Sequence, residues 1–196
     1  MKYLFIPVLA TVMLLLATPS AQATTLPVKT VQTELTQLGY NTGPVEGIFG
    51  SETLAAVKAF QTTEGLPVDG IVGPQSSQAL GILTTAKSFT GVPYVWGGTT
   101  PAGFDCSGFT QYVFRVNGVA LPRTSQEQYQ VGTPVSFNDL RPGDLVFFTF
   151  LANHQASHVG IYLGNNQFIS ATTHKGVTTY PFTPYWNNAY VGAKRV

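Results

Sequence analysis

The spacing of hydrophobic residues divides the chain into a helical first part and a strand-rich second part. Between residues 28 and 82, apolar side chains recur every three or four positions, as at Leu54, Val57 and Phe60. This is the period of an α-helix with one buried face. A further, short helix is predicted around Leu80. The first part is therefore predicted to be a small unit of three short helices.

An internal repeat lies inside this helical part. PVEGIFGSET (residues 44–53) and PVDGIVGPQS (residues 67–76) share the order Pro, Val, acid, Gly, Ile, apolar residue, Gly. Glycine adopts backbone conformations that other residues avoid, so each copy predicts a turn. Ser51 and Pro74 suit the N-cap or first turn of the helix that follows each turn.

Residues 28–82 closely resemble the peptidoglycan-binding three-helix module found beside cell-wall hydrolases. The stretches LGYNTGPVEGIFGSETLAAVKAFQ and GLPVDGIVGP carry the resemblance, which implies that this unit binds peptidoglycan. Its glutamates have no histidine or cysteine nearby in the sequence, so no catalytic site is predicted in it.

After a minimal linker at residues 83–86, residues 87–196 contain more aromatic residues and glycines. One amphipathic helix is predicted from about Cys106 to Val116, followed by several short strands separated by turns. A helix followed by antiparallel strands indicates an α+β fold. The predicted strands are Leu145–Phe150, Val159–Leu163, Gln167–Thr172 and Tyr190–Lys194.

The chain contains one cysteine, in the stretch FDCSGF. Asp105 is a suitable N-cap and Asn117-Gly118 a suitable helix end, which places Cys106 in the first helical turn. The amide dipoles at a helix start favour a thiolate, which is the better nucleophile. Gly108 leaves room for a substrate chain to approach. The alternative is a buried cysteine that does no chemistry.

A cysteine nucleophile needs a base, and the chain has three histidines. His158 begins the strand SHVGIYLG, in which Val159 and Ile161 are predicted to face the core while His158 faces the other side. His154 lies in a predicted loop, and His174 follows the strand that ends at Thr172. A metal site built on His154 and His158 is an alternative, but no cluster of carboxylates accompanies them.

The second part resembles the NlpC family of papain-like cysteine peptidases. The resemblance implies a papain-like catalytic domain with Cys106 as nucleophile and His158 as general base. It further implies that Tyr94, Asp105 and Ser107 form a pocket that grips the free amine of a peptidoglycan stem peptide. Family members typically cut the bond between γ-D-glutamate and a diamino acid. The matching stretches are PYVWGG (93–98), FDCSGF (104–109), LPRTS (121–125), RPGDLVFF (141–148) and SHVGIYLG (157–164).

This sequence departs from the family pattern at Ser170, where the third polar residue, twelve positions after the catalytic histidine, is most often another histidine. A three-residue loop between the two strands would put Ser170 on the same face as His158 but diagonal to it, about 7–8 Å away. We therefore expect Ser170 to orient His158 through a water molecule, or Thr172 or His174 to do so instead.

The first 23 residues have one basic residue, a long apolar run and the small-residue pattern Ala21-Gln22-Ala23. These features predict a secretory signal peptide, with a retained membrane anchor as the alternative. Cleavage after Ala23 leaves nine basic and nine acidic side chains, because Lys2 is lost from the ten basic residues. A neutral chain argues against nucleic acid or an anionic membrane as the main partner.

We therefore predict a signal peptide (residues 1–23), a peptidoglycan-binding-like helical domain (28–82) and an NlpC-type peptidase domain (87–196). The predicted protein is a monomeric cell-wall hydrolase that is secreted or periplasmic, acts on peptidoglycan and needs no cofactor or metal. After signal cleavage, no stable membrane insertion is expected. The alternative is a weak or inactive wall-binding protein with a degenerate site.

Overall fold

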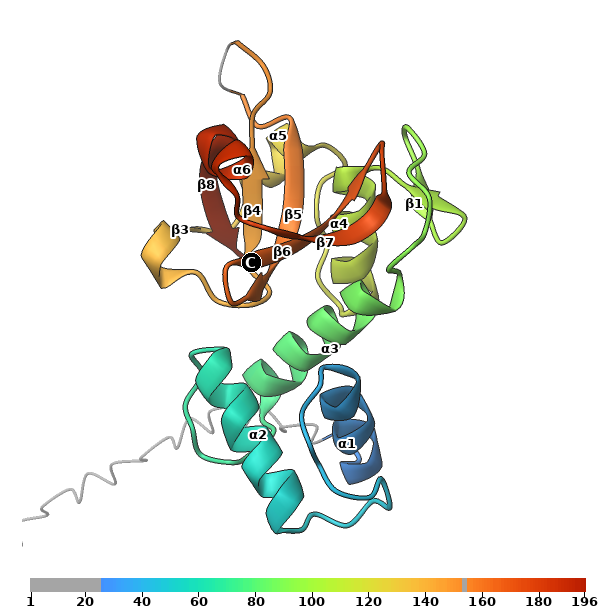
Figure 1. Ribbon diagram of the computed structural model, residues 1–196, viewed down its shortest axis with the longest axis vertical. Coiled ribbons are helices and arrows are strands. Elements are labelled where there is room, and N and C mark those ends of the chain that lie inside the picture. Colours follow the sequence, from blue (N-terminus) through green and yellow to red (C-terminus); the bar gives the residue numbers. More distant parts are fainter. Residues whose placement is uncertain (1–25, 153–154) are drawn as a thin grey trace, which may run out of the picture.

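The computed structural model describes residues 26–152 and 155–196. The predicted signal peptide lies outside these residues. Three helices, α1 (Val28–Gln37), α2 (Ser51–Thr63) and α3 (Pro74–Ser88), form a helical unit, shown in blue to green at the bottom of Figure 1. The remaining elements form a second, mixed unit above it. No helix within the described ranges is long and apolar enough to cross a membrane.

The repeated sequence forms two turns of similar construction, each held by a glutamine from the preceding helix. The Gln32 amide donates to the carbonyls of Pro44 and Ile48, and the Gly47 N–H donates to its oxygen at 2.9 Å. Gln61 is the equivalent residue in the second copy. Each glutamine is about 1% exposed. These hydrogen bonds therefore take the place of those that the buried amide would otherwise make to water. The helical unit thus satisfies its polar groups locally.

The mixed unit is built on one antiparallel sheet with the strand order β3-β8-β4-β5-β6-β7. Four of these strands match the predicted ones closely. The strands β3 and β7 and the helix α6 were not predicted from the sequence. The bounds are β3 Thr133–Val135, β4 Leu145–Phe148, β5 His158–Gly164, β6 Gln167–Thr172, β7 Gly176–Pro181 and β8 Tyr190–Arg195, with the short pair β1 Thr99–Thr100 and β2 Gly103–Phe104.

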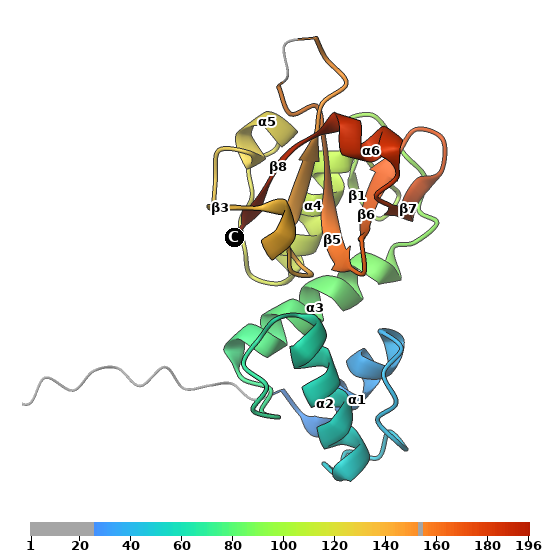
Figure 2. The ribbon, with the colours of Figure 1, turned by 60° about the vertical axis from the view of Figure 1, so that its left-hand side comes forward.

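Both faces of this sheet are covered, as Figure 2 shows. Helix α4 (Cys106–Val116) covers one face, where Phe109 and Val113 pack against strand residues such as Val159. On the other face, α6 (Pro184–Ala189) packs Trp186 against Phe148. The helices α5 (Ser125–Gln128) and η1 (Phe137–Asp139) lie between α4 and β4 in the chain. The predicted α+β fold, with a helix followed by antiparallel strands, is confirmed.

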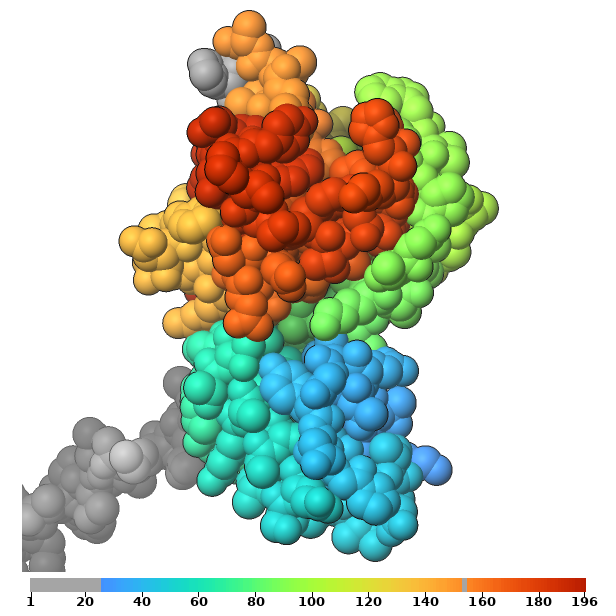
Figure 3. Space-filling model, in the orientation of Figure 1, coloured from blue at the N-terminus to red at the C-terminus, as the bar shows by residue number. Residues whose placement is uncertain are grey.

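Helix α3 belongs to both units. Its residues Leu80 and Leu83 pack in the core of the helical unit, whereas Ile82 and Ala86 pack in the core of the mixed unit. The linker predicted at residues 83–86 is therefore wrong, because those residues lie in the middle of a continuous helix. The two units also touch elsewhere along their boundary, which Figure 3 shows as a continuous junction. The wall-binding-like unit is thus joined to the sheet through a helix rather than a flexible segment.

The hairpin between β5 and β6 turns through Asn165 and Asn166, both in the left-handed region with φ of 49° and 57°. Two such residues form the tight turn that suits paired strands. A register shift between Tyr162 and Gly164 adds one residue to β5. This bulge has the same effect as the predicted three-residue loop, because it keeps residues 158 and 170 on one face.

Candidate active site

Cys106 is the first residue of α4, as the sequence predicts. Asp105 caps the helix, and its carboxylate accepts a hydrogen bond of 2.6 Å from the Gly108 N–H. The sulfur is partly exposed and lines a cavity of about 490 Å³. We call this cavity the cysteine pocket. Its lining residues are Tyr94, Trp96, Gly97, Asp105, Cys106, Ser107, Arg123, Thr124, Ser125, Gln126, Ser157 and His158. Cys106 therefore faces open space rather than a sealed core.

His158 begins β5 and lines the cysteine pocket together with Cys106. The backbone N–H of the next residue, Val159, acts to lower the pKa of the Cys106 thiol, so it lies near the sulfur. Helix α4 packs on the face of β5, which brings the helix start to the start of this strand. The imidazole contacts Trp186 on its other side, with the ring centres 5.5 Å apart. The fold thus places the predicted nucleophile and base in the same cavity.

Ser170 contacts His158 directly. Its Oγ lies 2.9 Å from His158 Nε2 and 2.6 Å from the carbonyl oxygen of Val159. A carbonyl only accepts hydrogen bonds, so the Ser170 hydroxyl donates to Val159 and accepts from Nε2–H. In the neutral imidazole, Nδ1 is then the nitrogen without a proton. Ser170 therefore fixes the tautomer in which Nδ1 is free to accept a proton.

The expectation that Ser170 needs a water molecule to reach His158 is wrong. Gly160 lies opposite Ser170 on the neighbouring strand and has no side chain to block it. The Ser170 side chain crosses this gap to reach the imidazole. Neither of the other two predicted partners takes this role: the Thr172 hydroxyl bonds Tyr180 at 2.6 Å, and the His174 side chain is exposed.

Burial controls the protonation of both central groups. Burial raises the pKa of the Cys106 thiol, while backbone N–H groups, that of Val159 foremost, act in the opposite direction. Burial also lowers the pKa of His158 to about 4. Both shifts favour the uncharged forms of the two groups, a thiol and an imidazole. This direction runs against the predicted thiolate, because the effect of burial on the thiol is larger than that of the backbone N–H groups around it.

Asp105 is held by a partner that the sequence analysis did not single out. Both Asp105 oxygens bond Arg123, and one of them also accepts a hydrogen bond of 3.0 Å from the Gly97 N–H. Arg123 donates a further bond of 2.9 Å to the Ser107 hydroxyl. The only sequence signal for Arg123 was its place in LPRTS, one of the stretches that carry the family resemblance.

The predicted pocket residues do come together, with different exposures. Tyr94 is partly exposed and bridges to the strand residue Phe104, while Ser107 is buried. Gly108 does not serve substrate approach, as its position in the sequence suggested. A side-chain carbon at Gly108 would lie 2.0 Å from the Gly98 carbonyl oxygen, so its role is to let that loop pack on the helix.

The sequence pattern of the NlpC/P60 family matches residues 91–195, just over half of the 196-residue chain. The chain belongs to the NlpC/P60 family. The pattern of the putative peptidoglycan binding domain matches residues 24–80, over the helical unit. The predicted combination of an NlpC-type cysteine peptidase domain with an N-terminal peptidoglycan-binding module is confirmed.

Curated NlpC/P60 relatives include the murein DD-endopeptidase MepS/murein LD-carboxypeptidase of Escherichia coli K12, which is 46% identical over 117 residues. The match covers 59% of this chain and 61% of that protein. The gamma-DL-glutamyl hydrolase of Bacillus subtilis is 42% identical over 117 residues, which cover 58% of this chain and 28% of the relative. The chain thus matches less than two thirds of the length of either relative.

Solved NlpC/P60 structures agree with the fold. A Bacillus cereus family member is 37% identical with a TM-score of 0.57, and covers 60% of this chain and 39% of that chain. The NlpC/P60 domain of the peptidoglycan hydrolase SagA is 33% identical with a TM-score of 0.53, and covers 60% of this chain and 98% of that chain. Each of the two matches covers 60% of this chain.

The metal alternative has no support in the part of the chain that the structure describes. Across residues 26–152 and 155–196, no group of three histidine, cysteine or acidic side chains is arranged to hold a metal ion. His154, one of the two suggested ligands, lies outside the described residues. His158, the other, is bonded to Ser170 through Nε2.

Proposed function

We propose that this protein is an exported peptidoglycan hydrolase that cuts the amide bond between γ-D-glutamate and the diamino acid of a stem peptide. The observation that carries the proposal is one cavity that holds Cys106 beside His158, with Ser170 fixing the tautomer of the imidazole. The family membership and the names of the relatives support peptidoglycan as the substrate. The apolar N-terminal stretch supports export.

In the proposed reaction, Nδ1 of His158 takes the proton of the Cys106 thiol as the sulfur attacks the amide carbonyl carbon. The carbonyl oxygen becomes an oxyanion, which the backbone N–H groups at the start of α4 stabilise. The carbon–nitrogen bond then breaks, and the imidazolium gives its proton to the leaving amine. Water hydrolyses the resulting thioester, which releases the carboxylic acid and restores the thiol. Because burial favours the uncharged form of both groups, the proposed proton transfer accompanies the attack.

The residues around Asp105 give the acyl half of the substrate a polar pocket. The Arg123 guanidinium neutralises Asp105 and has N–H groups left over after its bonds to Asp105 and Ser107. These donors suit a carboxylate such as that of γ-D-glutamate. Tyr94 forms a wall of the same pocket. We propose that Tyr94, Asp105 and Ser107 bind the free amino end of the stem, while the spare donors of Arg123 bind the carboxylate of γ-D-glutamate.

The helical unit is proposed to bind the insoluble polymer and so raise the local substrate concentration. Because α3 contributes to both cores, a deletion that ends at residue 82 would also remove Ile82 from the core of the mixed unit. Such a deletion would confuse wall binding with folding of the peptidase. Point substitutions in the full chain avoid this problem.

The test is mass spectrometry of muropeptides after digestion by the wild type and by Cys106→Ala. The wild type is expected to release fragments that end in γ-D-glutamate, and the variant to release none. Both proteins should still sediment with insoluble peptidoglycan. Cleavage that persists in Cys106→Ala would overturn the assignment of the nucleophile.

A wall-binding protein without activity is the second candidate, and the serine at position 170 favours it because a histidine is usual there. That function predicts that the wild type also leaves muropeptides intact while it still sediments with peptidoglycan. The same digestion therefore separates the two candidates.

A further inference from the structure

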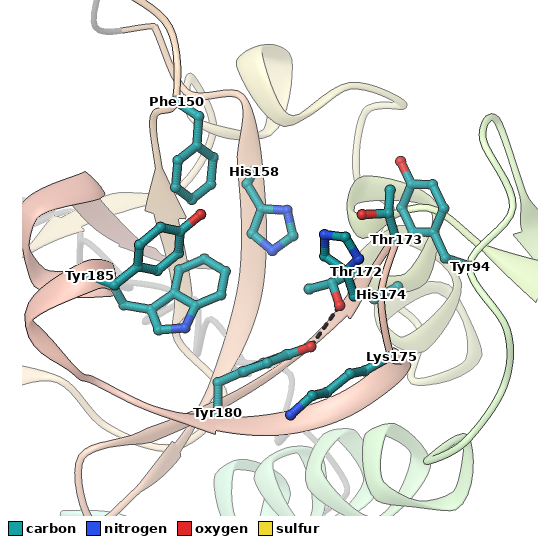
Figure 4. A pocket seen from close by; sticks show the side chains of 11 residues that line it. Tyr94, Phe150, His158, Thr172, Thr173, His174, Lys175, Tyr180 and Tyr185 are labelled. Carbon is teal, nitrogen blue, oxygen red and sulfur yellow. Dashed lines mark hydrogen bonds between the residues drawn. The ribbon is translucent and has the colours of Figure 1, made fainter.

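A second cavity of about 450 Å³ lies on the other side of His158 from the cysteine pocket. We call it the aromatic pocket, and Figure 4 shows the imidazole at its centre. Only His158 and Tyr94 line both cavities, so the two form one cleft divided by the imidazole. The aromatic pocket is lined by Tyr94, Phe150, His158, Ala171, Thr172, Thr173, His174, Lys175, Tyr180, Tyr185 and Trp186.

The order of bond breaking assigns the two cavities to the two halves of the substrate. The acyl half stays attached to the Cys106 sulfur, so it must occupy the cavity that the sulfur lines, the cysteine pocket. The leaving amine takes its proton from His158 and never bonds the sulfur. The aromatic pocket contacts His158 and does not include Cys106 among its lining residues. The leaving half therefore fits the aromatic pocket.

The walls of the aromatic pocket suit an aliphatic chain. Phe150 and Tyr185 stack with ring centres 5.5 Å apart and stand on one side of His158 in Figure 4. Trp186 and Tyr180 contact each other beneath them, with ring centres 5.3 Å apart. Rings that surround a chain of methylene groups remove its apolar surface from water.

The aromatic pocket is lined by basic side chains and by no acidic ones. None of its lining residues is acidic, while Lys175 and His174 both lie on its rim. The two ion pairs found among the described residues are Arg123–Asp105 and Arg195–Asp144, so neither involves Lys175. An ammonium group without a carboxylate partner at the edge of an apolar cavity favours an anionic ligand.

The turn that carries Lys175 is held in place by its neighbours. Gly176 has a φ of 63°, and a side-chain carbon there would lie 2.2 Å from the Val92 carbonyl oxygen. Backbone bonds of 2.8 Å join Val177 to Gly91 and to Val92 on either side of this contact. The backbone at Lys175 is therefore fixed relative to the cleft, and only its side chain needs to be ordered by a ligand.

We propose that the aromatic pocket binds the residue on the leaving side of the cut bond and that Lys175 recognises a carboxylate on that residue. The inference rests on the proposed function and names its substrate more closely. A diamino acid with a carboxylate at the end of its side chain, such as diaminopimelate, meets Lys175 with an opposite charge. A lysine side chain lacks this carboxylate and ends in an ammonium group alone, which Lys175 repels.

The test compares kcat/KM for four soluble tripeptides that share L-alanyl-γ-D-glutamate and differ only in the third residue. The four residues are diaminopimelate, diaminopimelate amidated on its side-chain carboxyl, diaminopimelate amidated at the C-terminus, and lysine. The wild type is expected to prefer diaminopimelate over lysine by about three- to tenfold, as for a partly exposed charge pair. Amidation of the side-chain carboxyl is expected to lower kcat/KM by the same factor, whereas a loss on C-terminal amidation alone would overturn the assignment of Lys175 to the side-chain carboxylate.

Lys175→Gln is expected to bring the ratio of diaminopimelate to lysine close to one, and Lys175→Glu to reverse it. Lys58→Gln, an exposed lysine of α2, is the matched control and should leave the ratio unchanged. An unchanged ratio in Lys175→Gln, with cleavage that still depends on Cys106, overturns the role of Lys175 alone. Failure of the wild type to cut any of the four tripeptides overturns the proposed function and this inference with it.

Discussion

The two units of the molecule use buried polar side chains in opposite ways. In the helical unit, Gln32 and Gln61 bond backbone groups and side chains of the turn that follows their own helix, at most 21 residues away. In the mixed unit, the polar side chains of the site come from α4, β5 and β6. The bonds of the two glutamines make a rigid scaffold, whereas the single bond from Ser170, 12 residues away on the neighbouring strand, leaves one nitrogen of His158 free to act on Cys106, which comes from α4.

Loss of His158, the proposed catalytic base, should produce the largest effect. His158→Gln keeps a planar polar side chain but removes the group that accepts the thiol proton. We expect kcat on soluble muropeptide to fall by about 10³- to 10⁴-fold. Steady-state kinetics with each tripeptide would measure the loss, and circular dichroism would verify that the fold is kept. A drop of less than tenfold would contradict the role of His158 as base.

The junction of the two units should respond to pH through Glu64, which is 3% exposed and has one oxygen without a hydrogen-bond partner among the described residues. Burial raises the pKa of Glu64 from 4.5 to about 8, with Lys87 acting against the rise. The folded protein therefore holds a neutral Glu64 while the unfolded chain ionises above pH 4.5. The free energy of unfolding must then fall as the pH rises from 4.5 to 8.

Glu64→Gln removes this titration and keeps the shape of the side chain. We expect the variant to gain on the order of 2–4 kcal/mol in unfolding free energy over the wild type between pH 4.5 and pH 8. Urea denaturation of both proteins at the two pH values measures the difference. Parallel pH profiles for the two proteins would show that Glu64 is ionised in the folded state.

Removal of a turn glutamine should weaken the helical unit without altering the chemistry. Gln61→Ala loses the bonds to Asp69, Ile71 and Ser76 and leaves the buried Gly70 N–H unsatisfied. We expect a loss of about 2–4 kcal/mol in local stability. Hydrogen exchange should report faster exchange in α2 and in the turn, while kcat on soluble tripeptides stays within twofold of the wild type. Gln32→Ala is the matched variant in the first copy of the repeat.

A methyl group at Gly160 should disturb the contact between Ser170 and His158. The added carbon would lie 2.9 Å from the Ile169 carbonyl oxygen and 3.2 Å from Ser170 Cβ. We expect Gly160→Ala to cost about 1–3 kcal/mol of stability and to lower kcat more than it changes KM. Gly50→Ala, where no atom lies within 4 Å of the added carbon, is the control, with a loss below about 1 kcal/mol.

The sequence determined the local elements of this protein. The period of apolar residues gave the positions of the helices, and Asp105 with Asn117-Gly118 gave the two ends of α4. The motif stretches, taken with their order, predicted the family and the pairing of Cys106 with His158. These features depend on neighbours within a few turns of the chain, so one segment is enough to specify them. The strand β7 is short and polar, and the helix α6 has only six residues. Neither shows a regular spacing of apolar residues, so the sequence analysis did not predict them.

Only the tertiary structure decided the chemistry of the site. The direct bond from Ser170 to His158 depends on a bulge in β5 and on the absence of a side chain at Gly160. The pKa values of Cys106 and His158 depend on burial by elements that lie far away in the sequence. The continuity of α3 through both cores likewise arises from packing between segments, as does the place of Lys175 on the rim of the cavity that His158 lines. A sequence pattern describes residues that are neighbours along the chain. The burial of a side chain, and the distance between two side chains, depend on residues that are neighbours in space.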